Sequence, residues 1–224
     1  MKNYQRDDIG AITLEYQRAN NPQDRYASFD YCFYYFRQSS STALLADIEK
    51  SCLVLGFYLA SWGMLRGSSF LLNKSAKYYE PLIEYIAGLD KAIWEIDVDS
   101  YNKKNIETIL EVYDQIRSVF IMNKSAHITL VTKIMLGVFG IIPAFDNYFG
   151  NTFRGLFTDC GFRSVNKKSL DCLRKFYEHN KDDIDTFSNQ IFVTEFVSGE
   201  KSIIKYKKAK IIDMYGFTRG LNKS

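Results

Sequence analysis

The sequence predicts a mostly α-helical protein with a single globular domain. Only 3 prolines and 13 glycines interrupt its 224 residues, and so few chain breakers favour long helices over many short strands. Hydrophobic residues make up 46% of the chain, which is enough for a substantial core. We predict one helical domain over residues 25–224, preceded by a polar arm or a short lead-in helix over residues 1–24. Two helical lobes around a cleft are an alternative form of the same fold.

The first predicted helices follow from apolar residues at helical spacing. A helix over residues 25–38 carries an aromatic face, and the next helix begins after Ser41, whose hydroxyl can cap it. Its stripe comprises Leu44, Ile48, Cys52, Leu55, Leu59 and Trp62. Leu53 and Phe57 add a second apolar face, so we expect this helix to lie inside the molecule.

The remaining elements are predicted from the same periodicity. Further helices are expected over residues 76–87, 105–120, 129–140, 147–158, 167–179, 183–193 and 209–218. Trp94–Ser100 alternates like a strand but has no partner strand, so we expect an extended connection. Within it, Asp97 and Asp99 are expected at a solvated edge, because the later positions of an EF-hand loop are not matched.

Charge and cysteine usage place limits on the function. The net charge of +3 is too small to indicate nucleic-acid binding, but residues 90–114 are acidic and residues 201–210 are rich in lysine. Four cysteines without a C-x-x-C motif indicate buried thiols and a cytoplasmic protein. The longest apolar run, Cys52–Leu65, is too short to span a membrane, and no signal peptide is evident.

No cofactor or metal site is expected. His127 and His179 are the only histidines, and neither lies near a second metal ligand in the sequence. The chain has no Walker loop, no G-x-S-x-G motif and no G-x-G-x-x-G motif.

The segment Thr132–Asp146 carries the strongest functional signal. Lys133 shares a helix face with Thr129, Gly137 and Gly140, and these small residues permit close approach of another backbone or of a ligand. In the plainer interpretation the face packs on another helix and Lys133 extends to solvent.

Asp146 is the candidate catalytic residue. It follows Pro143 and stands among Phe145, Tyr148 and Phe149, where an unpartnered carboxylate would be costly. It can cap the next helix, act as a carboxylate at the mouth of a cleft, or do both.

A predicted helix that ends at Phe139-Gly140 is followed by Ile141-Ile142, by Pro143-x-x-Asp146 and by an aromatic helix. This order of elements resembles the helix-hairpin-helix DNA glycosylase superfamily over about residues 126–150. The resemblance implies that Asp146 is the catalytic aspartate of base excision. A flipped nucleotide would enter a pocket, where the carboxylate stabilises the cationic sugar or activates water.

The chain departs from that family in two places. Met122–Ala126 stands where the family has its glycine-rich hairpin, and the lysine nucleophile of bifunctional members would fall near Thr129. A lyase step through Lys133 is therefore not implied. A second resemblance, to small uncharacterised bacterial proteins, covers more of the chain and is carried by Tyr26-Ala-Ser-Phe-x-x-Cys32, Tyr58–Ser69 and Ile212-Asp-Met214. This resemblance implies a bacterial or phage origin but no activity.

The predicted function is nucleic-acid binding with DNA glycosylase-like base excision through Asp146. Expected contacts to DNA come from phosphate-binding residues and from one ring that stacks on a base. They are Arg66, Ser68, Lys124, Lys133, Tyr148, Lys205, Lys207 and Lys208. Arg66-Gly67-Ser68-Ser69 can alternatively end a helix, and the 201–210 lysines can belong to an exposed loop or hairpin.

The alternative function is a non-catalytic helical protein that binds another protein or DNA. It would use the tyrosine-rich surface and could act in phage defence or counter-defence. Neither alternative includes a membrane or a metal as partner.

Overall fold

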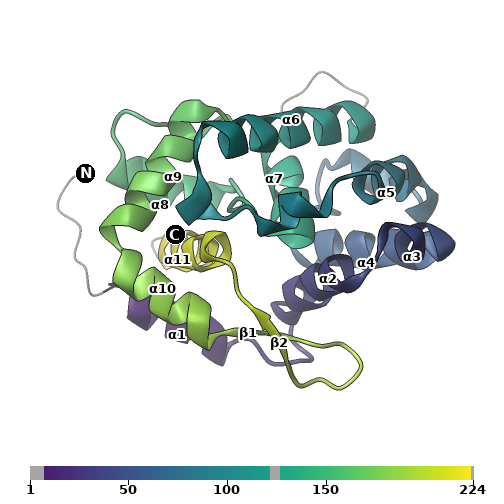
Figure 1. Ribbon diagram of the computed structural model, residues 1–224, viewed down its shortest axis with the longest axis horizontal. Helices are drawn as coiled ribbons and strands as arrows, with labels where there is room; N and C mark the ends of the chain where they lie inside the picture. The colour runs from purple at the N-terminus through teal and green to yellow at the C-terminus, as the bar shows by residue number, and fades with distance from the viewer. Residues whose placement is uncertain (1–7, 122–126, 223–224) are drawn as a thin grey trace.

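The structure is a computed structural model that describes residues 8–121 and 127–222. Within these residues the chain is mostly helical, with one two-stranded sheet (Figure 1). Buried apolar side chains from both ends of the described chain join one core. The predicted mostly α fold in a single domain is therefore confirmed.

The first part of the chain forms seven α-helices and four short 3-10 helices within the described residues. The α-helices are α1 (Asp8–Arg18), α2 (Ala27–Gln38), α3 (Ser41–Ala46), α4 (Ile48–Ser61), α5 (Glu80–Ala87), α6 (Lys103–Phe120) and α7 (Ile128–Phe139). The 3-10 helices are η1 (Phe70–Asn73), η2 (Ala76–Tyr79), η3 (Lys91–Glu95) and η4 (Val98–Ser100).

The second part contains the remaining described elements. They are α8 (Asn147–Leu156), α9 (Lys167–His179), α10 (Lys181–Gln190), β1 (Phe192–Thr194), β2 (Lys201–Lys205) and α11 (Lys208–Leu221). The two strands pair antiparallel as a hairpin. This hairpin matches one of the two forms expected for the first half of the 201–210 run, whereas the predicted helix 183–193 ends earlier, at Gln190.

Two buried helices organise the packing. α7 contacts α2, α4 and α6, while α11 contacts α1, α8 and α10. In Figure 1, α11 lies on the side of the molecule formed by α1, α8, α9 and α10, and α7 lies on the side formed by α4, α5 and α6. The candidate site described below lies between these two groups of helices.

The predicted helix after Ser41 is divided in two at Asp47. Asp47 leaves the helical conformation, with φ −128° and ψ 63°, and its carboxylate accepts a hydrogen bond from Lys50 N at 3.2 Å. An aspartate at this position satisfies a free amide at the start of α4. The expectation that this helix is buried on both apolar faces is also wrong, because Leu53 and Phe57 are exposed.

The segment Trp94–Ser100 forms 3-10 turns instead of an extended connection. Asp97 is buried there, and its carboxylate accepts hydrogen bonds from the backbone N–H groups of Val98, Lys208 and Ala209. A carboxylate beside free amides at the start of α11 is stabilised by those dipoles. The expected solvated edge at Asp97 is therefore wrong.

Candidate functional site

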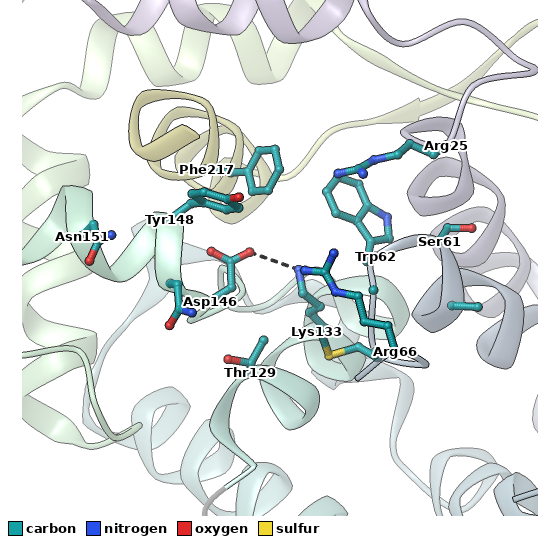
Figure 2. Close-up of a pocket in the computed structure, with 14 residues that line it drawn as sticks. Arg25, Ser61, Trp62, Arg66, Thr129, Lys133, Asp146, Tyr148, Asn151 and Phe217 are labelled. Carbon is teal, nitrogen blue, oxygen red and sulfur yellow. Dashed lines mark hydrogen bonds and ion pairs between the residues drawn. The ribbon is translucent and has the colours of Figure 1, made fainter. Parts of the chain in front are cut away.

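A pocket of about 640 Å³ lies between the two groups of helices. Its wall comes from the end of α4 and the turn after it, from α7, from the start of α8 and from α11 (Figure 2). Four of the residues predicted from the sequence line it: Arg66, Lys133, Asp146 and Tyr148. They are up to 82 positions apart in the chain, and the fold brings them together.

Asp146 is placed by the turn that precedes α8. Its backbone is extended, with φ −86° and ψ −179°, and its Oδ1 accepts a hydrogen bond from Phe149 N at 2.9 Å. The residue therefore caps α8, as one of its predicted roles requires. Behind it the rings of Phe145 and Phe149 stack at 5.4 Å between centroids. The Asp146 side chain keeps 14% exposure and lines the pocket.

Lys133 reaches Asp146 from α7. Its Nζ lies 3.2 Å from Asp146 Oδ2, and its side chain is only 5% exposed. Figure 2 shows the two side chains directed toward each other. The expectation that Lys133 extends to solvent is therefore wrong, because the ammonium is held by an acidic partner inside the wall.

The small residues beside Lys133 serve helix packing. A Cβ atom at Gly137 would overlap the ring of Tyr58 from α4, and the Tyr58 hydroxyl donates a hydrogen bond to the carbonyl oxygen of Lys133 at 3.0 Å. The packing part of the plainer interpretation thus holds at Gly137. Close approach of α4 fixes the backbone from which Lys133 extends.

Trp62 is the main site residue that the sequence did not reveal. It had been assigned only to a buried stripe. α4 ends here in a Schellman arrangement, in which Gly63 N donates to Ala60 O at 2.9 Å and Met64 N to Leu59 O at 2.8 Å. Gly63 has φ +76°, which glycine adopts without strain. The signal in the sequence that could have pointed to this residue is a tryptophan immediately before the glycine that ends the helix.

Three cations surround the Trp62 ring. Lys133 Nζ lies 5.1 Å from its centroid, Lys210 Nζ 5.3 Å and Arg25 Cζ 5.6 Å. The Trp62 Nε1 atom is buried, and it has no hydrogen-bond partner among the described residues.

Two exposed arginines flank the pocket. Arg25 lies over Trp62, and Arg66 packs on Gly63; neither forms an ion pair with a described residue at the distances of a salt bridge. The helix stop therefore lies at Gly63, before the segment Arg66–Ser69, and the phosphate-binding role of Arg66 stays a prediction. Ser68 is exposed on the same turn but does not line the pocket.

Aromatic rings form the remaining wall. Tyr148 is half-buried on the first turn of α8, and its ring meets that of Phe217 edge-on at 5.3 Å. Phe217 in turn meets Trp62 edge-on at 5.6 Å. In Figure 2 the ring of Tyr148 lies near Asp146, and the ring of Trp62 lies near Lys133.

The other predicted phosphate-binding lysines lie elsewhere. Lys205, Lys207 and Lys208 line a separate hollow with acidic residues of the 94–100 segment. Lys208 Nζ pairs with Asp99 Oδ2 at 2.6 Å, and Lys205 Nζ donates to Asn189 Oδ1 at 3.0 Å. The structure therefore does not bring these lysines to Asp146. Lys124 lies outside the described residues.

Lys207 is bound to backbone carbonyls. Its Nζ donates to the carbonyl oxygens of Trp94 and Ile96, each at 2.6 Å. Burial lowers the pKa of Lys207 to about 8. These bonds tie the chain before α11 to the 94–100 segment.

A second lysine–aspartate pair lies near Trp62. Lys210 Nζ lies 3.0 Å from Asp213 Oδ2, both on α11, and it also reaches the Tyr16 hydroxyl at 3.2 Å. Asp213 Oδ1 accepts a hydrogen bond from Ala144 N at 3.0 Å. This pair is sealed from solvent and lines no part of the pocket.

The described residues also bear on two other possibilities, a metal site and a membrane-spanning helix. No group of three or more histidine, cysteine, aspartate or glutamate residues gathers there in a way that could hold a metal ion. Over the same residues, no helix has the length and apolar character needed to cross a bilayer.

Comparisons with protein-family models, curated proteins and solved structures found no match to the chain. Any functional interpretation therefore depends on the pocket itself.

Proposed function

We propose that the pocket binds one nucleotide of a nucleic acid and that Asp146 acts in hydrolysis of the bond between its base and its sugar. The observation that carries this proposal is the pocket in which the Lys133–Asp146 pair lies beside two exposed arginines and aromatic rings. The resemblance around Pro143-x-x-Asp146 suggests the same reaction.

Charge and size support the binding step. Arg25, Arg66 and Lys133 bring three positive charges to the pocket, and Asp146 is its one carboxylate among the described lining residues. A volume of about 640 Å³ is typical of a site for a small organic group. Guanidinium groups bind phosphate well, and aromatic rings stack on bases. A nucleotide carries both chemistries in one unit.

The carboxylate of Asp146 has capacity left for chemistry. Oδ1 accepts from Phe149 N and Oδ2 pairs with Lys133. A carboxylate offers about four acceptor positions, so a water molecule can also bond to the exposed edge. In the proposed reaction water adds to the sugar C1′, the bond from C1′ to the base nitrogen breaks, and the base leaves with a proton. Asp146 stabilises the developing positive charge or takes the proton of the water.

One observation favours a non-catalytic binder as the second candidate. Both oxygens of Asp146 already have structural partners, so a cap and an ion pair account for the residue without catalysis. This candidate keeps the same pocket and the same ligand. It differs only in the fate of the glycosidic bond.

The Asp146→Asn variant separates the two candidates. The asparagine Oδ1 can still cap α8, so we expect a folded protein that binds DNA with a similar affinity. Release of free base from DNA carrying damaged or modified bases, measured by chromatography, should disappear in this variant. If the unaltered protein binds DNA but releases no base from any such substrate, excision is excluded and the binder remains.

The binding step is tested with matched arginine variants. Arg66→Ala should weaken DNA binding and reduce the slope of log affinity against log salt by about 1. The control is Arg163→Ala, at an exposed arginine that does not line the pocket. Fluorescence anisotropy at several salt concentrations gives both slopes. An unaltered protein that does not bind DNA at low salt would refute the proposed function.

A further inference from the structure

A second hollow of about 610 Å³ lies beside the candidate pocket and is mostly apolar. Its walls include Phe57 on α4, Tyr31 on α2 and Phe196 in the loop of the hairpin. Phe57 is 70% exposed and Phe196 72% exposed. Large apolar side chains gathered around one hollow are typical of a binding surface. We call this hollow the aromatic groove.

The aromatic groove and the pocket are adjacent. Arg25 and Ser61 line both of them. Ser61 is the last residue of α4, so Phe57 lies one helical turn from the pocket rim. Arg25 stands at the junction, over the ring of Trp62. A ligand that extends out of the pocket past Arg25 therefore enters the aromatic groove.

The rings of the aromatic groove are arranged as a surface for flat groups. Tyr31 and Phe196 meet edge-on at 5.1 Å, and the Tyr31 hydroxyl donates to the carbonyl oxygen of Pro22, which holds that ring in place. Phe57 lines the same groove, and its side chain is exposed. Successive bases of a single strand stack on such exposed rings, while a cation between them binds the connecting phosphate. Arg25 lines both the pocket and the groove, so it can bind the phosphate that joins the first nucleotide to the second.

We infer that the aromatic groove binds the unpaired nucleotides that follow the one held in the pocket, so that the preferred ligand is a single-stranded nucleic acid. The inference rests on the proposed function, because the first nucleotide occupies the proposed pocket. It adds a substrate class: strand segments whose bases are free to stack. A fully paired duplex cannot present its bases to Phe57 and Phe196.

The test compares thymidine 5′-monophosphate with a thymidine tetranucleotide by isothermal titration calorimetry. We expect the tetranucleotide to bind at least about tenfold more tightly, as stacking of added bases predicts. Phe57→Ser and Phe196→Ser should each reduce that advantage by about tenfold or more and leave the affinity for the monophosphate unchanged. Both residues are exposed, so these variants should keep the melting temperature of the unaltered protein.

The matched control is Val197→Ser, which removes an exposed apolar side chain beside Phe196 but outside the groove lining. It should bind both probes as the unaltered protein does. The inference would be overturned if the two probes bound with equal affinity, or if neither phenylalanine variant changed the affinity for the tetranucleotide. Either result would leave the pocket proposal intact. Failure of both probes to bind would refute the proposed function itself. Sedimentation tests a different occupant of the groove. If the unaltered protein is a dimer and Phe57→Ser is a monomer, a second copy of the chain occupies the groove and the inference is overturned.

Discussion

Two lysine–aspartate pairs place their ammonium groups near the Trp62 ring and differ in their access to the pocket. Lys210 and Asp213 are 1% and 8% exposed, at a separation of 3.0 Å. Lys133 and Asp146 are 5% and 14% exposed, at 3.2 Å, and they line the pocket. The chemical groups and the separations are nearly the same. The pairs differ in how much of their surface other residues bury, and only Lys133 and Asp146 are accessible to a ligand in the pocket.

The sealed pair also supports the open one. Asp213 accepts a hydrogen bond from Ala144 N, and Ala144 stands two residues before Asp146. The bond anchors the turn that presents Asp146 at the start of α8. A buried group with every partner in place rigidifies its surroundings, so one pair acts as scaffold for the other.

The largest expected effect on stability comes from removing the lysine of the buried Lys210–Asp213 pair. Lys210→Met leaves the Asp213 carboxylate buried without its cation, so the free energy of unfolding should fall by about 3–5 kcal/mol. Urea denaturation followed by circular dichroism measures it. The control is Lys168→Met, which removes an exposed partner of Asp159 and should change stability by less than about 1 kcal/mol. A loss no larger than that of the control would show that burial does not distinguish the pairs.

Lys207 extends the comparison to a buried lysine held by carbonyl groups. Its pKa in the folded protein, about 8, lies below the ordinary value of 10.5. Between these values the unfolded chain binds more protons at this lysine, so the contribution of Lys207 to stability should rise with pH by at most about 3 kcal/mol. Below pH 8 both states are protonated, and this contribution stays constant.

The pH series should be read as the difference between the unaltered protein and Lys207→Met over about pH 8 to 9.5, before tyrosines ionise. The comparison is needed because burial also raises the pKa of Cys32, Cys52 and Cys172, and these thiols lower stability over the same range. Burial raises the pKa of Tyr58 and of Tyr206, and such groups lower stability at higher pH. Urea midpoints at each pH give the slope. The Lys207→Met variant should lack the rise, and an equal slope in both proteins would assign it to other groups.

The smallest of the three effects is expected at the open pair. Lys133→Met leaves Asp146 with its capping bond and with access to water, so unfolding should require only about 1–2 kcal/mol less. The same urea titrations apply. If Lys133→Met costs as much as Lys210→Met, the pocket is closed in solution and the contrast between the pairs is lost.

Local signals in the sequence predicted the helices well. The predicted helix 167–179 has the same limits as α9, and the predicted helix 105–120 differs from α6 only in its first two residues. The capping role of Asp146 was also predicted, because it depends only on the turn that precedes α8. Apolar spacing and end residues act over a few positions, so the sequence contains them directly.

Errors arose where the outcome depended on distant segments. Asp97 looked exposed because the backbone amides it binds are more than a hundred positions away at the start of α11. Phe57 looked buried because its apolar face has the same pattern as a core face, although no other helix covers it. Periodicity identifies an apolar face but does not say what packs on it.

For the candidate site, the residues of Thr132–Asp146 identified Lys133 and Asp146 but not their pairing, and they gave no sign of Trp62 or Arg25. The chain alone determined where helices begin and end, since propensity and capping are short-range. Tertiary packing decided which lysine–aspartate pair is covered and which opens to the pocket. That choice depends on contacts among α4, α7, α8 and α11, which the fold brings together from distant parts of the sequence.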